Sequence, residues 1–301
     1  MVNKKPKIVT IGTFDGVHIG HRKIIKRLVE SAQNSELESA VLTFFPHPRM
    51  VLQKELGIQL INTIEERKEI LLSIGVDHLC VYPFTKEFSR LTAQEYIEQI
   101  LVNKLQAKKV IIGYDHRFGR NRNADINDLK EYGKQYGFEV EEISKQDVDE
   151  VAVSSTKIRV ALEEGDLEKA NTYLGSQFLL TGTIVKGKGL GKGLGFPTAN
   201  LKIEENYKLI PKNGVYVVKS LIDNKEVFGM MNIGYNPTVG GSTKTIETHF
   251  FDLNKDLYGK ELQIKMLKRV RDEKKFEGVE QLMEAMKEDQ EFSLNYIHQI
   301  K

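Results

Sequence analysis

The hydrophobic pattern of the chain changes its period at about residue 175, and no other feature constrains the fold as strongly. Before that point, helical patterns alternate with short apolar runs, at residues 8–11, 40–44, 79–82 and 110–112. Runs of this length are typical of buried parallel strands, and strands that alternate with helices imply right-handed crossovers and a sheet covered on both faces. The helices should present two apolar faces, one formed by Ile24, Ile25, Leu28 and Ala32 and the other by Ile97, Ile100, Leu101 and Leu105. The first part of the chain is therefore predicted to be an α/β domain with a Rossmann-like parallel sheet.

Beyond residue 175 the helical pattern stops, and glycine and β-branched residues take over. The apolar runs are now 181–185, 214–218, 227–231 and 262–266. Their length and the turn residues between them predict a small antiparallel β-barrel, with a sandwich as the alternative. A last helix should start near Gly278 and pack across the barrel through Val279, Leu282, Met283 and Met286. A chain of 301 residues is long enough for two domains, and we expect them to be residues 1–176 and 177–301.

Charge and cysteine usage exclude several classes of protein. The 44 Lys and Arg residues against 42 Asp and Glu give a net charge of +2, which argues against a protein that binds nucleic acid through its bulk charge. The one cysteine, Cys80, has no partner for an intramolecular disulfide, as suits a reducing compartment. The first residues do not form a signal peptide, and no run approaches the roughly 18 apolar residues of a membrane span. We therefore expect a soluble, cytoplasmic protein, a monomer or weak homo-oligomer, with neither nucleic acid nor membrane as partner.

The strongest local motif is Gly12-Thr13-Phe14-Asp15-Gly16-Val17-His18-Ile19-Gly20-His21, between the first strand and the first helix. Ligands of parallel sheets bind at the carboxyl ends of the strands, and the N–H groups at a helix start attract phosphate. His18 and His21 are three residues apart and should face one anion, where imidazoles can stabilise a phosphoryl group in transfer. A zinc site is disfavoured because no third ligand has suitable spacing. The sequence thus predicts a phosphate site with His18 and His21 as its catalytic groups.

This motif resembles the signature of the nucleotidylyltransferase superfamily, in the form carried by bacterial bifunctional riboflavin kinase/FAD synthetases. Three later segments resemble the same family: Thr43-Phe44-Phe45-Pro46-His47-Pro48, the loop from Gly113 to Gly119, and Ser154-Ser155-Thr156-Lys157-Ile158-Arg159. The loop departs from the family at His116, where phenylalanine is usual. The resemblance implies that this nucleotidylyltransferase domain transfers AMP from ATP to FMN with Mg²⁺, forming FAD and releasing pyrophosphate.

The resemblance also implies the contact residues of this domain. Ser155 and Thr156 would cap a helix that receives a phosphate, and Arg159 would add a charged fork one turn later. His116 should preserve a stacking face. The residues expected to bind ATP and its phosphates are Gly12, Phe14, Asp15, Gly16, His18, His21, Ser155, Thr156 and Arg159. Those expected to bind FMN are His47, Asp115 and Phe118.

A second site is predicted at the start of the C-terminal domain, where residues 182–200 contain six glycines. The segment is not a Walker A loop, because no Gly-Lys-Ser/Thr closes it, but its free N–H groups suit a phosphate. Thr198 and Asn200 should lie on one strand face, and their oxygens are suitable ligands for Mg²⁺. The residues expected to bind ATP here are Gly187, Gly189, Gly191, Gly193, Gly195 and Thr198.

The stretch Gly195-Phe196-Pro197-Thr198-Ala199-Asn200 resembles the riboflavin kinase signature, and residues 246–252 resemble that family's Glu-x-His strand. The resemblance implies that Glu247 is the base that accepts the proton of the riboflavin hydroxyl. It spans about residues 7–297. The chain as a whole is therefore expected to phosphorylate riboflavin to FMN and to adenylylate FMN to FAD.

Three alternatives remain open at this stage. The first domain could adenylylate another acceptor, such as pantetheine phosphate or nicotinamide mononucleotide, although such relatives lack the second domain. The kinase half could be inactive, although Thr198, Asn200 and Glu247 are all present. The protein could instead store or sense flavin, although a regulator would be expected to carry a basic helix-turn-helix, and none is found.

Overall fold

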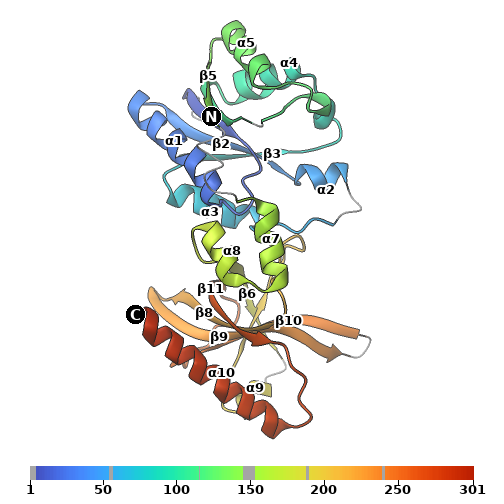
Figure 1. Cartoon of the computed structure of the whole chain (residues 1–301), viewed down its shortest axis with the longest axis vertical. Helices are drawn as coiled ribbons and strands as arrows, with labels where there is room; N and C mark the ends of the chain where they lie inside the picture. The colour runs from blue at the N-terminus through green and yellow to red at the C-terminus, as the bar shows by residue number, and fades with distance from the viewer. Residues whose placement is uncertain (1–4, 54–56, 115, 145–152, 188–189, 239–240) are drawn as a thin grey trace. The chain divides into compact units, whose positions relative to one another are not determined.

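The computed structural model describes residues 5–53, 57–114, 116–144, 153–187, 190–238 and 241–301. It divides into two compact units, residues 1–155 and 156–301 (Figure 1). The predicted boundary at residues 176/177 lies later in the chain than this division. The difference consists of two helices, α7 (Ser155–Glu164) and α8 (Leu167–Leu174), which from Thr156 onward belong to the second unit. Each unit is described separately below.

The first unit is built on a parallel five-stranded sheet with the order β3-β2-β1-β4-β5. This arrangement confirms the predicted α/β fold. The chain adds β2 and β3 on one side of β1 and then crosses to the other side for β4, so the winding reverses between β1 and β4. Ligands of such sheets bind outside the carboxyl ends of the strands at this reversal. The strands are β1 (Lys7–Ile11), β2 (Glu38–Phe45), β3 (His78–Pro83), β4 (Ala107–Gly113) and β5 (Glu139–Ile143).

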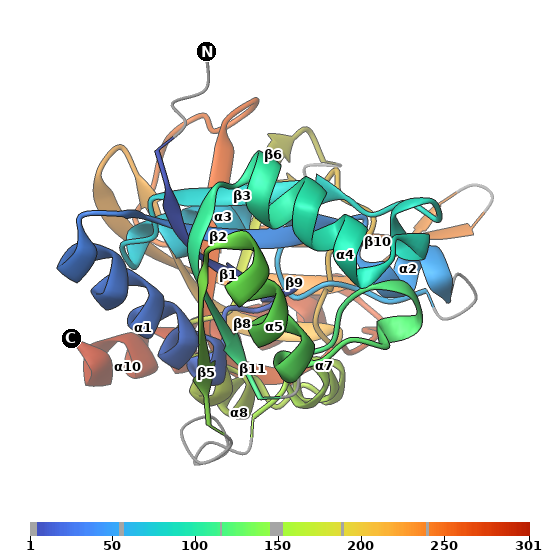
Figure 2. The same ribbon diagram turned by 90° about the horizontal axis from the view of Figure 1, so that it is seen from above.

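Helices cover both faces of this sheet. On one face, Ile25 and Leu28 of the first helix pack with Ile8, Val41 and Ile111 of the strands. The opposite face carries the apolar side chains of the later helices, and Figure 2 shows α4 and α5 in front of the strands. The α-helices are α1 (Ile19–Ser35), α2 (Pro48–Leu52), α3 (Ile64–Ser73), α4 (Ala93–Tyr96) and α5 (Ile126–Tyr136); the short 3₁₀ turns are η2 (Phe88–Arg90) and η4 (Arg120–Arg122).

The helix predicted around Ile97 has an unusual form. Its expected apolar face is buried, but the segment η3 (Ile97–Lys104) is a π-helix that continues α4. The N–H of Leu105 accordingly donates to the carbonyl of Ile100, five residues back, at 2.9 Å. The predicted apolar face is therefore confirmed, whereas the spacing of the apolar residues did not reveal the wider turn of a π-helix.

The second unit is a closed antiparallel barrel with the strand order β10-β7-β6-β11-β8-β9. It confirms the predicted barrel and excludes the sandwich. The strands are β6 (Leu179–Val185), β7 (Ala199–Lys202), β8 (Gly214–Ile222), β9 (Lys225–Thr238), β10 (Gly241–Phe250) and β11 (Glu261–Asp272). A short helix, α9 (Leu190–Gly193), stands between β6 and β7.

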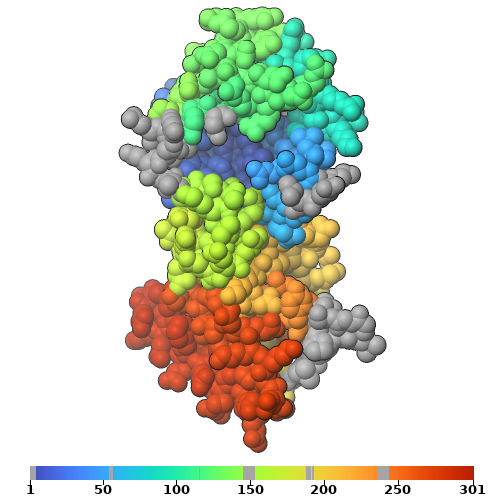
Figure 3. All heavy atoms as spheres, turned by 45° about the vertical axis from the view of Figure 1, so that its right-hand side comes forward, coloured from blue at the N-terminus to red at the C-terminus, as the bar shows by residue number. Residues whose placement is uncertain are grey.

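The C-terminal helix α10 (Val279–Ile300) packs on the barrel as predicted, and the predicted Met286 packs against a buried cluster there, but the fully buried residues of the helix lie further along it. Its buried residues are Asp289, Ser293 and Ile297, four apart, whereas Val279 is 59% exposed. Arg271 of β11 donates two hydrogen bonds of 2.7 Å to the carboxylate of Asp289 and so anchors the helix. Figure 3 shows the end of the chain, in red, on the surface of this unit. In the ranges that the structure describes, no helix combines the length and the apolar character needed to cross a bilayer.

Candidate functional site

The first candidate site lies at the loop between β1 and α1, where the sheet reverses its winding. The N–H of Gly12 still bonds to β2, through the carbonyl of Leu42 at 3.0 Å. The loop then turns sharply, with φ values of 47° at Phe14, 87° at Gly16 and 41° at Val17. Positive φ is natural for glycine but costs a β-branched residue such as valine energy. The loop therefore needs support from its surroundings.

His18 and His21 stand together where this loop enters α1. Their rings stack with centroids 3.5 Å apart and planes inclined by 17°. His18 is the N-cap of α1, and its Nδ1 accepts a hydrogen bond of 3.3 Å from the backbone N–H of His21. Because Nδ1 accepts, the proton of a neutral His18 ring is on Nε2.

The electrostatics of the pair favour neutral rings. Burial lowers the pKa of His18 to about 4, with Asp15 opposing the effect. Burial, His18 and the Arg67 guanidinium hold the pKa of His21 well below its usual value. Neutral imidazoles can donate hydrogen bonds to a phosphate without carrying charge. Within the described residues, Nδ1 of His21 is buried and has no hydrogen-bond partner.

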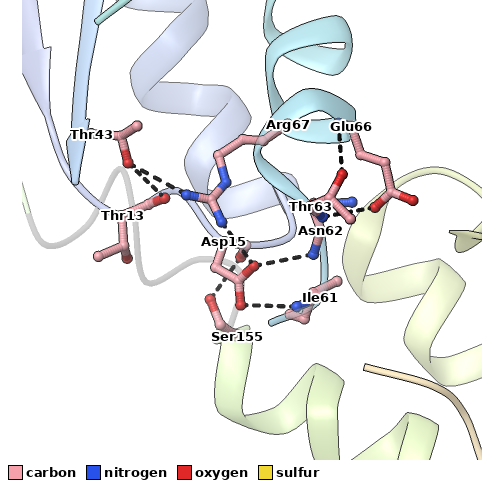
Figure 4. Close-up of polar contacts among 9 residues, drawn as sticks. All are labelled: Thr13, Asp15, Thr43, Ile61, Asn62, Thr63, Glu66, Arg67 and Ser155. Atoms are coloured by element: carbon pink, nitrogen blue, oxygen red, sulfur yellow. Dashed lines mark hydrogen bonds and ion pairs between the residues drawn. The ribbon is translucent and has the colours of Figure 1, made fainter. Parts of the chain in front are cut away.

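The carboxylate of Asp15 is held by groups of the protein itself. Its side chain is 1% exposed, and its two carboxylate oxygens accept from the backbone N–H groups of Ile61 and Asn62 at 3.1 and 3.2 Å. Arg67 adds an ion pair at 3.3 Å (Figure 4). The carboxylate therefore bonds to the segment that opens α3, and this geometry fits support of the loop better than contact with a phosphate.

Ser155 meets the same loop from the far end of the unit. Its hydroxyl donates to the carbonyl of Asp15 at 2.8 Å (Figure 4). Because α7 begins at Ser155, both Ser155 and Thr156 lie in the first turn, and the preceding position is Ser154. Thr156 is exposed, and Arg159, one turn on, is half-buried. Thr156 and Arg159 fall in the second compact unit.

The residues predicted to bind FMN follow the ends of β2 and β4. His47 is buried, and its Nδ1 accepts from the N–H of Arg49 at 3.1 Å as the N-cap of α2. Phe118 is also buried, and the ring of His116 stacks on it at 6.0 Å with planes inclined by 21°. His116 thus presents a flat face here, as its aromatic counterpart would. Asp115 lies outside the described residues.

An aromatic cluster beside Phe118 was not predicted. It joins the ends of β2 and β3 to the start of the π-helix, with ring centroids 4.9 to 6.1 Å apart in successive pairs. Its members are Phe44, Tyr82, Phe84, Phe88, Tyr96 and Phe118. They are dispersed over the sequence, and the only signal was that two of them end predicted strands.

The second candidate site lies in the barrel, where β7 meets β10. Asn200 and Glu247 are cross-strand partners, so their side chains share one face of the sheet. The hydroxyl of Thr198, just before β7, donates to the Glu247 carboxylate at 3.1 Å. The structure thus brings together the three residues that were predicted as base and metal ligands.

The glycines before this site have different surroundings. A Cβ at Gly187 would lie 2.2 Å from the Asn200 amide nitrogen, so the backbone passes directly against that side chain. A Cβ at Gly191 would meet the carbonyl of Phe196 at 2.3 Å, which assigns this glycine to the fold of its own loop. Gly193 and Gly195 adjoin open space, and Gly189 lies outside the described residues.

His249, two residues after Glu247, contacts the same segment. Its Nδ1 lies 2.9 Å from the carbonyl of Pro197, an acceptor, so Nδ1 is the donor. Its ring packs edge-on against Phe196 and Phe251 at 5.3 and 5.7 Å. This contact holds the backbone immediately before Thr198.

The reversed winding beside a histidine pair suits nucleotidyl transfer, and the carboxylate aligned with a hydroxyl and an amide in the barrel suits phosphoryl transfer. Two family models match the chain: FAD synthetase over residues 1–157 and riboflavin kinase over residues 174–297. The chain belongs to the family of bifunctional riboflavin kinase/FMN adenylyltransferases, and it is a transferase that carries both activities.

Relatives of this family match nearly the whole chain. The Listeria monocytogenes bifunctional riboflavin kinase/FMN adenylyltransferase is 38% identical over 95% of this chain and 90% of its own length. The Bacillus subtilis protein of the same name is 32% identical, covering 98% and 93%. A crystal structure described as a macrolide-efflux protein from Streptococcus pneumoniae is 32% identical, with a TM-score of 0.85 over 96% of this chain and 94% of that one.

Proposed function

We propose that the two activities of this family are performed at the two sites described above. In the first, the phosphate of FMN attacks the α-phosphorus of ATP, and pyrophosphate leaves. In the second, the riboflavin hydroxyl attacks the γ-phosphorus, ADP leaves, and Glu247 accepts the hydroxyl proton. The observation that carries the proposal is the convergence of Thr198, Asn200 and Glu247 at one strand pair, because that geometry matches the chemistry of a kinase.

In the first site, His18 and His21 act as neutral donors. Their rings stack at the start of α1, where the helix also offers unpaired N–H groups to an anion. Donors that are fixed before the reaction stabilise the charge that develops on the transferring group. The proposed ATP contacts at Gly12 and Gly16 are made by the backbone of the same loop. His47 and Phe118 are proposed to contact FMN.

The barrel site fits a magnesium ion. Thr198 and Asn200 offer neutral oxygens and Glu247 a charged one, and Mg²⁺ favours such hard donors together with substrate phosphates. We propose that Thr198 and Asn200 hold the ion, which when bound would neutralise charge on the phosphates of ATP. Thr198 meanwhile keeps the Glu247 carboxylate oriented through its hydrogen bond. Among the described residues there is no group of three His, Cys, Asp or Glu side chains that could hold a metal.

We also propose that residues 1–176 and 177–301 form the functional domains and that the enzyme acts in the cytoplasm as a monomer or weak homo-oligomer. The two family models match separate parts of the chain, residues 1–157 and 174–297, which supports a division into two functional domains. Residues 158–173 belong to neither match.

One experiment tests the proposed function directly. The full chain is incubated with riboflavin, ATP and Mg²⁺, and FMN and FAD are separated by chromatography over time. FMN should appear first and FAD after it, while FMN supplied alone should yield FAD. Omission of Mg²⁺ should abolish both products. Failure to form FMN, or failure to convert supplied FMN, would contradict the assignment of the corresponding site.

A further inference from the structure

The buried Arg67 on α3 pairs with Asp15 but has been given no part in the proposed reaction so far. Its side chain is 1% exposed, among the lowest values for any charged residue that the structure describes. The helix start that carries it is well fixed. Thr63 accepts from the N–H of Glu66 at 3.1 Å, and the Glu66 carboxylate accepts from the N–H of Thr63 at 2.9 Å. This reciprocal pair is a capping box, which defines the first turn of the helix.

From this fixed helix, Arg67 reaches the loop between β1 and α1 at two places. Its Nη2 lies 3.3 Å from Oδ1 of Asp15. Its Nη1 donates to the hydroxyl of Thr43 at 3.4 Å, and that hydroxyl donates to the carbonyl of Thr13 at 3.2 Å. Figure 4 shows the guanidinium between these two groups. The guanidinium therefore fixes the residues on both sides of Phe14.

Phe14 transmits this constraint to a proposed catalytic group. Its φ is 47°, and its ring is buried and meets the ring of His21 edge-on at 5.1 Å. Gly12 leaves room for that ring, since a Cβ there would lie 2.9 Å from it. A backbone in this conformation persists only where its surroundings hold it. A shift of the Thr13–Asp15 segment would move the ring against which His21 packs.

We propose that Arg67 is a positioning residue for adenylyl transfer: by bonding to Asp15 and Thr43 it fixes the loop and, through Phe14, the place of His21. It does so without contacting substrate. The inference rests on the proposed function in one respect, namely that His21 acts on the transferring group.

Arg67 also has an electrostatic effect on His21. Asp15 from the loop acts on His18, whereas His18 and Arg67 from α3 act on His21. The positive charge of Arg67 lowers the pKa of His21, after burial and His18, whereas Asp15 raises that of His18. Removal of the guanidinium should therefore raise the pKa of His21 and make the ring easier to protonate.

The test uses three variants of the full chain, Arg67→Met, Arg67→Lys and the double variant Asp15→Asn/Arg67→Met. Lys68→Met is the matched control, because its side chain lies next on the same helix and is 51% exposed. Each is assayed for FAD formation from supplied FMN and ATP, for riboflavin phosphorylation, and for the pH dependence of kcat. The fraction of folded protein is measured by circular dichroism.

We expect Arg67→Met to lower kcat for FAD formation about 10²-fold, the loss typical of a misplaced catalytic group, with a smaller change in KM. Riboflavin phosphorylation should be unchanged. The acid limb of the pH profile should move to higher pH in Arg67→Met and stay in place in Arg67→Lys, which keeps the charge. A role in folding alone would lower the folded fraction without moving that limb.

The double variant keeps the test decisive if Arg67→Met does not fold, because it also removes the carboxylate charge that would be left buried without the guanidinium. A folded double variant with a kcat within about threefold of the wild type, well short of that 10²-fold loss, would overturn the proposal. So would an unchanged acid limb in folded Arg67→Met. If His21→Ala also formed FAD at the wild-type rate, the proposed function of the first site would be contradicted. If the Arg67 variants formed FAD at the wild-type rate and His21→Ala did not, only the inference about Arg67 would be contradicted.

Discussion

Replacement of Glu247 by glutamine separates base chemistry from structure at the barrel site. Glutamine keeps the size of the side chain and an oxygen that can accept the 3.1 Å hydrogen bond from Thr198. Since that bond can remain, the free energy of unfolding should change by less than about 1 kcal/mol. The variant loses the ability to accept a proton. General-base catalysis contributes about 10²–10⁴-fold in rate, which corresponds to about 3–5 kcal/mol in the activation free energy.

The assay follows conversion of riboflavin to FMN at saturating ATP and Mg²⁺. Conversion of supplied FMN to FAD serves as the internal standard, because the residues proposed for it lie elsewhere in the chain. Glu261→Gln is the matched control, since it removes an exposed carboxylate from another strand of the same barrel. It should leave both activities unchanged.

A Glu247→Gln enzyme that retained more than about a tenth of the kinase rate would refute the assignment of the base, because even the weakest general-base effect is larger. His249 would then be the next candidate. Its Nδ1 donates to Pro197, so its Nε2 is the nitrogen that could accept a proton. His249→Asn would test that role.

Three further predictions concern the remaining features. His21→Ala should lower FAD formation about 10²–10³-fold without loss of kinase activity. His78→Ala, at an exposed histidine, is the control, and an FAD rate equal to that of the wild type in His21→Ala would contradict the site. A fragment of residues 156–301 should unfold at higher urea than one of residues 177–301, because Asn171 accepts from the N–H of Phe178 at 2.7 Å and donates to the carbonyl of Met266 at 3.0 Å; equal midpoints would contradict this. The folded His18 has a pKa of about 4, below the roughly 6.5 of an unfolded chain, so the unfolded state binds the proton first as the pH falls. His18 alone should therefore lower the stability of the first unit by about 2 kcal/mol between pH 7 and pH 5, and the total drop should be smaller in His18→Asn.

The sequence was sufficient to predict the architecture because the two periods of its hydrophobic pattern differ so clearly. All four predicted strands of the first unit are present, and so is the barrel. The edge strand Glu139–Ile143 was missed, because only Ile143 in it is buried and its glutamates interrupt the apolar signal. A strand with one fully buried residue gives little hydrophobic periodicity to detect.

The candidate sites were predictable in their residue types but not in their contacts. Glu247 and Thr198 are far apart in sequence, and only the pairing of β7 with β10 brings them together. Asp15 was expected at a phosphate because of its neighbours in the motif. One partner of its side chain, Arg67, lies in a helix whose local sequence pattern gives no sign of the contact. Buried polar networks depend on tertiary packing, which local sequence patterns do not encode.

The strand pair that carries the proposed kinase residues is also the shortest pairing among the described residues of the barrel. β7 joins β10 through two residue pairs, Asn200 with Glu247 and Ala199 with Thr248. A pairing this short is a natural place for local opening, which requires less free energy than unfolding of the whole barrel. Each such opening would separate the proposed base from the proposed metal ligands while the other strands stay paired. Amide hydrogen exchange in β7 would then report directly on the fraction of time in which the enzyme is competent as a kinase, and a ligand that bridges the two strands would slow that exchange.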